Sequence, residues 1–588
     1  MVNPWMEAVV GPAMEAEVGP EAGRLGRTGF IPLDDRPCTR DFAPKLAAIL
    51  GEELIMPPDR CLGHFLQPGD PPAVGRWLLE QAASLSAVVV SADMLAHGGL
   101  IASRSPACSL REAMEGVSAL RAAKTRNPRL HIYASSVLMR ISITARDKES
   151  YRYWRLMNEY SILWARARQG VATAEELQRL EECEAGLPRR VIDDYFAVRR
   201  RNHEINRQMV EMVADGTVDF LSICQEDAHP YGPHRLEQAR LEEQIRKLGV
   251  GDRVAMYAGA DEAGMLLLAR HYNLLTGNRP EFGCEFYPPG DEANVAPFED
   301  RPFIENLRAQ IGVVLGSLAP KEAGSAFCLA SCPGKGDLLK HGAPSGGEGG
   351  SPAKTVAGLT QEATFLARKV ADLAPAVAGL ARAVAGGKIA GVIDVRYPNG
   401  ADPDLVAAMR QELDIARLGA FAAWNTAGNT MGTVLAHLSI LGAAVQSGRW
   451  GPENMARHYE FLLERFLDDW IYQGSVREEL RTYLAGRADI ESEYNLGKAY
   501  GEVNRLAAQK VEERGREFYR KHLAGHVCSV GTASRRGSGK GFWRLAPEVE
   551  IQAYLPWERI FEIAVQARVV VETGEKTFGE SHLNVEVD

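Results

Sequence analysis

The chain has 588 residues and a net charge of −10 at pH 7, with 46% hydrophobic and 24% charged residues. The length exceeds what one hydrophobic core usually supports, so several domains are expected. The acidic balance excludes the basic face that nucleic-acid binding needs, and no apolar run approaches the ~20 residues that span a bilayer. The nine cysteines show no disulfide or zinc-ribbon pattern. We therefore expect a cytoplasmic protein without nucleic-acid or membrane partners.

The N-terminal half of the chain alternates strands with helices. Residues 1–27 contain Gly, Glu, Ala and Pro without periodicity and predict a disordered leader. Strands are then predicted at residues 29–33, 53–56, 87–91, 130–139, 219–224, 254–257, 281–287 and 326–331. Helical patterns separate them, and residues 146–215 predict a long helical insertion. The alternation predicts right-handed crossovers and a parallel sheet within residues 28–332.

The C-terminal half follows a segment rich in Gly, Ser, Pro and Lys at residues 333–352, which predicts a flexible linker or an exposed loop. Residues 353–440 predict a further α/β segment that completes the site. Residues 441–588 predict a mainly helical region that ends in short strands.

Two α/β architectures fit this order of elements. The eight strands before residue 332 favour a distorted (β/α)8 barrel with additions. Two further strands follow the linker, at residues 389–394 and 418–423, and a closed barrel leaves no place for them. The alternative is a pair of doubly wound α/β domains that face each other across a cleft. The sequence leaves both open.

Polar residues directly follow five of the apolar strands. A buried parallel strand should stay apolar to its end. Charge at this point means that the chain leaves the sheet at its carboxyl edge, where α/β proteins build their sites. The residues reached in this way are Asp34, Asp35, Arg36, Asp93, Gln225, Glu226, Asp227, Asp261, Glu262 and Asp394. We therefore expect one functional edge.

Two adjacent carboxylate pairs at strand ends are the predicted catalytic groups, namely Glu226, Asp227, Asp261 and Glu262. Such pairs could provide the acid and the base or nucleophile of glycoside hydrolysis. The predicted substrate-binding residues are Asp34, Asp35, Arg36, Asp93, Arg104, Asp394, Asn399, Trp424, Asn425, Thr426 and Asn429. For the first three of these, helix capping by Asp beside a surface Arg is the alternative interpretation.

The segment Trp424–Thr430 combines an aromatic face with amide and hydroxyl groups, which suit sugar hydroxyls and an acetamido group. The alternative is a turn in which Asn and Thr cap the next helix. Two Asn-Thr pairs four residues apart exceed what one cap needs, so binding is favoured.

No metal or cofactor is predicted. The double glycine at residues 98–99 lacks the spacing of a nucleotide-binding loop, and the chain has no G-x-S-x-G elbow. One polar cluster could hold a divalent metal, although its spacing matches no zinc motif. It contains Glu226, Asp227, His229 and His234.

A set of motifs resembles one known family. The motifs are Pro32–Pro37, Asp93 through Arg104, Asp227 with Pro230–Gly232, Gly259–Glu262, Asn399–Asp402, Trp424–Thr430 and Leu555–Arg559. They resemble the bacterial domain of unknown function 4127 over about residues 28–565. Mild departures are Glu226, where an Asp is expected, and Ala423, where a Gly is expected. The resemblance implies a shared site and supplies no reaction.

From these observations we expect a carbohydrate-active hydrolase that acts on an amino sugar or a short glycoside. One alternative is a metal-dependent hydrolase of amide or phosphate bonds. The other is a non-catalytic, two-lobed protein that binds a small ligand. Whether the chain forms a homo-oligomer stays open.

Overall fold

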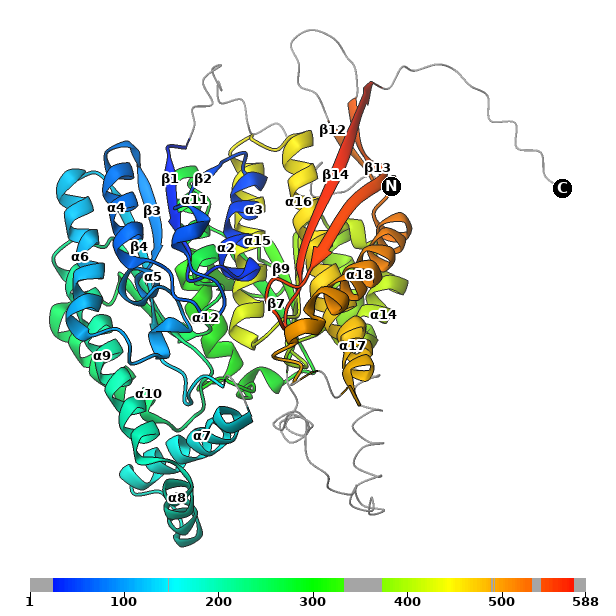
Figure 1. Cartoon of the computed structure of the whole chain (residues 1–588). Helices are drawn as coiled ribbons and strands as arrows, with labels where there is room; N and C mark the ends of the chain where they lie inside the picture. The colour runs from blue at the N-terminus through cyan, green and yellow to red at the C-terminus, as the bar shows by residue number, and fades with distance from the viewer. Residues whose placement is uncertain are drawn as a thin grey trace, which may run out of the picture.

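The computed structural model describes residues 25–145, 148–332, 373–487, 490, 492–530 and 541–575. All but the last three residues of the predicted leader, and the whole predicted linker at 333–352, lie outside the described residues. Figure 1 shows two sheets with helices packed around them and a long hairpin near the C-terminus. Among the described residues, no helix is long and apolar enough to cross a membrane.

The first sheet is parallel throughout and has the order β2-β1-β3-β4-β5-β6. Its strands are β1 (Thr28–Ile31), β2 (Leu54–Ile55), β3 (Ala87–Ser91), β4 (His131–Leu138), β5 (Phe220–Gln225) and β6 (Val254–Ala258). Successive side chains enter different cores. Val88 and Val90 pack with α4 (Pro71–Gln81) and α6 (Leu110–Arg126), whereas Val89 faces the core that contains α3 (Phe42–Ile49). Helices therefore cover both faces, as a doubly wound sheet requires.

The second sheet repeats this topology. It contains β7 (Glu281–Tyr287), β8 (Ser317–Ala319), β9 (Ala326–Ser331), β10 (Ile389–Asp394) and β11 (Ala420–Ala422), all parallel. Its order, β11-β10-β9-β7-β8, places the first strand between the second and the third, as in the first sheet. Each sheet thus has a switch point, where doubly wound proteins bind ligands.

The expected parallel α/β architecture is confirmed. The strands divide between two open sheets, in agreement with the doubly wound alternative, and they do not close into the expected barrel. Counting strands favoured the barrel because β7 and β9 alternate with helices, as the strands of a (β/α)8 barrel do. In the structure these two strands pair with each other in the second sheet. Sequence order does not reveal which strands are neighbours.

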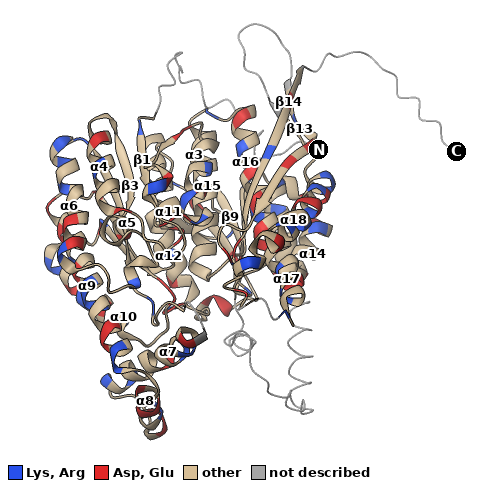
Figure 2. Cartoon of the chain, viewed as in Figure 1, with Lys and Arg blue, Asp and Glu red and all other residues tan. Residues whose placement is uncertain are grey.

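The residues predicted as a helical insertion form α7 (Lys148–Arg168), α8 (Ala174–Gly186) and α9 (Arg189–Ala214). Met157, Cys183 and Tyr195 form part of a small core between them. We call the part of the molecule built on the first sheet the first lobe and the part built on the second sheet the second lobe. In Figure 1, α7 and α8 project from the lower end of the first lobe. Charged residues gather on the outer helices, whereas the strands of the two parallel sheets are mostly uncharged (Figure 2).

The C-terminal region combines helices with a third sheet. The helices are α14 (Pro403–Glu412), α15 (Ala427–Gln446), α16 (Pro452–Arg465), the π-helical η7 (Phe466–Val476), α17 (Arg477–Leu484) and α18 (Tyr500–His522). Antiparallel β12 (Val527–Val530), β13 (Gly541–Tyr554) and β14 (Ala564–Glu575) follow. The last two strands are longer than the expected short pieces. A register shift between Leu545 and Val549 interrupts their pattern.

Two glycines in the second lobe permit its close contact with the first lobe. Helix α15 follows the last strand of the second sheet and packs against α11 (Ala263–Thr276), which follows β6. A Cβ at Gly428 would lie 2.2 Å from the carbonyl oxygen of Ala258, and one at Gly432 would lie 2.2 Å from Cγ of Glu262. Only glycine permits this approach, which fixes the start of α15 against the carboxyl end of β6.

Candidate functional site

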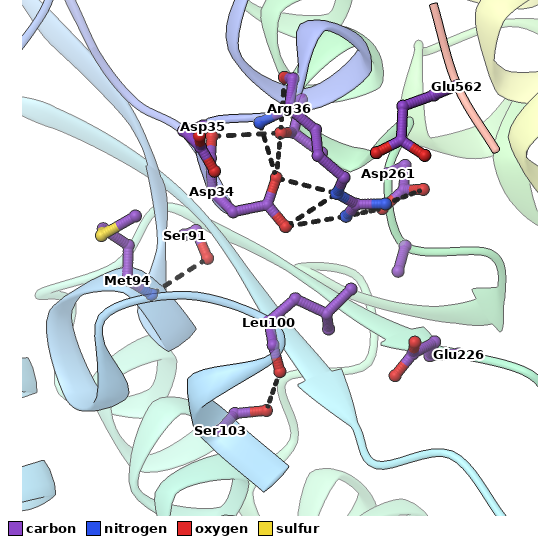
Figure 3. A network of polar contacts seen from close by, with 12 residues as sticks. Asp34, Asp35, Arg36, Ser91, Met94, Leu100, Ser103, Glu226, Asp261 and Glu562 are labelled. Carbon is purple, nitrogen blue, oxygen red and sulfur yellow. Dashed lines mark hydrogen bonds and ion pairs between the residues drawn. The ribbon is translucent and has the colours of Figure 1, made fainter. Parts of the chain in front are cut away.

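Arg36 is the centre of a network at the carboxyl edge of the first sheet. Its Nη2 lies 2.8 Å from Oδ2 of Asp34 and 2.6 Å from Oδ1 of Asp261, and its Nη1 donates to Asp261 at 3.0 Å. Figure 3 shows the guanidinium between the two carboxylates. All three side chains are largely buried. The ends of β1 and β6 are therefore tied by a bidentate arginine, a geometry that favours ionised carboxylates.

The second lobe holds Asp261 from the other side. Nδ2 of Asn425 donates to Asp261 Oδ2 at 3.2 Å, and Oδ1 of Asn429 accepts from the backbone N–H of Ala260 and of Asp261 at 3.2 and 3.3 Å. Asn425 has a φ of 55°, a left-handed conformation that Asn tolerates better than most residues. The predicted Asn residues thus meet the predicted Asp261, although the two segments belong to different sheets.

A second group of ion pairs lies beside this network. Arg104 pairs with Glu226, and Arg140 pairs with Asp227 and lies 3.9 Å from Glu226. Asp227 also has a positive φ of 35°. Glu226 Oε2 and the Nε atoms of Arg104 and Arg140 are buried without a hydrogen-bond partner. Unpaired buried polar atoms are costly, so these three atoms can still form a hydrogen bond.

Burial sets the protonation of these acids. Burial raises the pKa of Glu226 against the opposing charges of Arg104 and Arg140. Burial likewise raises the pKa of Asp261, with Arg36 opposing it. Asp34 differs, because the charge and hydrogen bonds of Arg36 outweigh burial and lower its pKa. The edge therefore combines a firmly ionised carboxylate with two that hold protons more tightly.

Asp93 is buried two residues after the end of β3. Its Oδ2 accepts from the backbone N–H of Val137 at 2.9 Å. Burial raises its pKa to about 7, and the charge of Glu226 adds to the effect. With 4% of its surface exposed, Asp93 supports the end of β4 and does not reach a ligand directly.

A small hollow lies at the switch point between β1 and β3. Its lining includes Asp34, Asp35, the 98–99 glycine pair, Phe65 and Trp557. Nε1 of Trp557 donates to Asp35 Oδ2 at 3.1 Å, and Nδ1 of His64 lies 2.8 Å from the same oxygen. The loop between β13 and β14 thus reaches the first sheet and fixes one predicted binding residue.

Glu262 does not line this site, in contrast to its predicted catalytic role. Its side chain is fully buried beneath Gly259 and Gly432, and Oε1 accepts from Gln310 Nε2 at 3.2 Å. Burial raises the pKa of Glu262 well above its usual value. The adjacent position in the sequence suggested a pair with Asp261, but the first turn of α11 turns the two side chains apart.

Most of the Trp424 segment stabilises its own turn. The Trp424 indole donates to Thr433 Oγ1 at 3.0 Å and packs edge-on against Phe42 at 5.8 Å, so it cannot stack on a ligand. Thr430 Oγ1 bonds both backbone groups of Trp424. Thr426 is the N-cap residue of α15. Because the Thr426 side chain makes no capping hydrogen bond, the turn interpretation accounts only for Trp424 and Thr430, and only the two Asn side chains reach Asp261.

Asp394 and Asn399 affect the site indirectly, through the position of Asn425. Asp394 is fully buried at the end of β10, and its carboxylate accepts from the N–H groups of Asp402 and Arg396 at 2.6 and 3.2 Å. Burial raises its pKa to about 7. The loop that it holds places the N–H of Asn399 3.1 Å from the carbonyl oxygen of Asn425. Both residues position Asn425 and do not face the hollow.

The polar cluster that was weighed as an alternative metal site does not come together. Among the described residues, no group of three or more His, Cys, Asp and Glu side chains converges in a way that could hold a metal ion. His229 bonds to the backbone of Tyr231, and His234 is buried near Asp300. The metal-dependent alternative therefore has no ligand set in the described part of the chain.

Sequence reasoning missed several residues of the site. They are Thr39, His64, Arg140, Trp557 and Glu562, the last of which lies beside Arg36 in Figure 3. A signal existed for Arg140, because it follows the apolar run of β4 as the predicted acids follow theirs. Trp557 lies in the Leu555–Arg559 motif of the family resemblance, but nothing in the sequence indicated its partner Asp35, which is 522 residues away.

Comparison with protein-family models matches residues 28–566 to a family described as "Protein of unknown function (DUF4127)". A search of curated proteins finds no match.

Proposed function

Because the chain belongs to this family of unknown function, we propose its activity from the site alone: a glycosidase-like hydrolase that acts on a small carbohydrate, such as an amino sugar or a short glycoside. The reaction needs one carboxyl group that holds a proton and one that acts as base or nucleophile. The carboxyl edge of the first sheet offers both kinds.

The observation that carries the proposal is the state of Glu226. One carboxyl oxygen is engaged by Arg104, while Oε2 is buried and unpartnered. Burial raises the pKa of this carboxyl group. A carboxyl group with a raised pKa and one oxygen outside the arginine ion pair is suited to donate a proton to a leaving group. Glu226 is therefore the proposed general acid.

Asp261 is the proposed base or nucleophile. Arg36 and Asn425 hold its two oxygens in a fixed orientation, and the charge of Arg36 opposes the rise in pKa that burial causes. A carboxylate fixed in this way loses little freedom on meeting the substrate. Substrate hydroxyl groups would bind Asp34 and Asp35 in the neighbouring hollow, whose wall includes the glycine pair at 98–99.

The test uses aryl glycosides, including N-acetylhexosaminides, with wild type, Glu226→Gln and Asp261→Asn. We expect each substitution to reduce kcat by at least about 100-fold, the usual contribution of such a group. Glu262→Gln is the matched control, because this buried carboxyl group holds its proton and a glutamine has the same shape. Equal rates for wild type and Glu226→Gln, or no turnover of any glycoside, would refute the proposal.

A non-catalytic binding protein is the second candidate. It is favoured by the pairing of Asp34, Asp261, Glu226 and Asp227 with arginines, which suits a fixed recognition surface. This candidate predicts saturable binding of a sugar without turnover. Product analysis by NMR after long incubation separates the two, and the anomeric form of any product shows retention or inversion.

A further inference from the structure

A tight turn places an aromatic ring at a position that normally requires glycine. In the turn Ala296–Glu299, the N–H of Glu299 donates to the carbonyl oxygen of Ala296 at 3.2 Å, Pro297 stands second, and Phe298 stands third with a φ of 66°. These are the features of a type II turn, whose third position favours Gly or Asn. A bulky residue with positive φ is strained and persists only where the surrounding structure holds it.

The ring of Phe298 is not needed to hold the turn. Its surface is 40% exposed, whereas Ala296, Glu299 and Asp300 are buried. Glu299 accepts from the N–H of Gly428 at 2.7 Å, and Asp300 accepts from Gln238 at 2.6 Å. No stacking or cation–π contact to this ring is found among the described residues. The loop is thus rigid on both sides of a single projecting ring.

The turn lies directly beside the proposed acid. The carbonyl oxygen of Phe298 accepts from the N–H of Ala228 at 2.8 Å, two residues after Glu226. Asp227, between them, has the positive φ noted above. Strained backbone that is retained at a functional edge indicates a role for the side chain that it presents.

Phe65 provides a contrast. It also has a positive φ, of 52°, in a turn closed by His64 and Gln67. Its ring, however, packs 4.9 Å from that of Trp557, and Arg559 lies over it at 5.5 Å. Packing explains the ring of Phe65. It does not explain the ring of Phe298.

We propose that Phe298 is a substrate-recognition residue whose exposed ring stacks on the apolar C–H face of a pyranose ring bound beside Glu226. The substrate class rests on the proposed function. The assignment also replaces Trp424, the aromatic residue expected in this role, whose indole is buried. Such a ring contributes affinity through apolar area and fixed geometry at little entropic cost.

Three variants separate recognition from structure. Phe298→Ala removes the ring and keeps the strained Cβ, Phe298→Gly removes both, and Phe298→Trp keeps both. Binding of methyl pyranosides, including methyl N-acetylglucosaminide, is measured by saturation-transfer NMR, and the unfolding temperature by differential scanning fluorimetry. We expect about tenfold weaker binding for Ala and Gly, near-wild-type binding for Trp, and a raised unfolding temperature only for Gly.

The outcomes also separate this inference from the hydrolase. Binding that Gly and Ala lose, with no turnover by wild type, supports the role of Phe298 and removes the hydrolase. Unchanged binding or KM in Gly and Ala, with turnover intact, overturns the role of Phe298 and leaves the hydrolase standing. Wild type that binds none of the methyl pyranosides overturns the proposed recognition and the carbohydrate substrate together.

Discussion

Replacing Arg36 with Met tests the central network. The substitution leaves Asp34 and Asp261 buried without their cation, and removal of one partner from a buried ion pair costs about 3–5 kcal/mol. With an unfolding entropy of about 2.1 cal/mol/K per residue over the chain, this loss lowers the unfolding temperature by roughly 2–4 °C if the chain unfolds as one unit.

The loss should depend on pH. Without Arg36 the folded-state pKa of Asp34 rises above its unfolded value, which lies near about 4, and the pKa of Asp261, already raised by burial, rises further. Below that pH both groups are protonated in either state, and little stability is lost. As the pH rises from about 4 to 7, the unfolded chain releases protons that the folded protein retains, so the deficit grows.

The assay is thermal unfolding of wild type and Arg36→Met at pH 4.5 and pH 7.5. A triple variant that adds Asp34→Asn and Asp261→Asn serves as the control, because it has no charge left to bury. We expect it to recover most of the loss at pH 7.5. A deficit that is equal at both pH values, or that the triple variant does not reduce, would contradict the assignment of Arg36 as the compensating charge.

Two further predictions concern packing and buried acids. Gly432→Val would place side-chain atoms against Glu262 and should lower the unfolding temperature. The control is Gly442→Ala in the same helix, where the nearest atom to the new Cβ is at 3.5 Å, and it should be neutral or stabilising by up to about 1 kcal/mol. Equal stability of the two variants would argue against the close contact of α11 and α15. Burial raises the pKa of Asp469 to about 8, so the unfolding free energy should fall as the pH rises from about 4 to 8. Asp469→Asn should reduce this slope, measured in urea titrations, by up to roughly 1.4 kcal/mol per pH unit. A slope identical to that of wild type would show that Asp469 is ionised in the folded protein.

The location of the site could be predicted because it depends on local pattern. An apolar run that ends in Asp or Glu marks a carboxyl edge, whatever the order of the strands. Asp34, Glu226 and Asp261 were found in this way and do lie at one edge. Arg140 carries the same signal with the opposite charge and could have been included.

The residues that contact each site residue could not be predicted, because these contacts join segments that are distant in the sequence. Glu262 looks like Asp261 in the sequence, and only the approach of Gly432 shows that it is enclosed. The indole of Trp424 looks available until Phe42 is placed against it. The same limit applies to the architecture, since strand order distinguishes two open sheets from a barrel and leaves no local trace.

The contacts that assemble the site span long stretches of chain. Asn425 and Asp261 are 164 residues apart, Arg36 and Asp261 are 225 apart, and Trp557 and Asp35 are 522 apart. During synthesis the first sheet can form well before residue 557 leaves the ribosome. Some of the residues that contact its charged edge are therefore made only later. Pairings of such high sequence separation close late and slowly. Competence for binding should therefore appear as the final step of folding, and a protein truncated before Trp557 would have a formed first sheet without the residue that fixes Asp35.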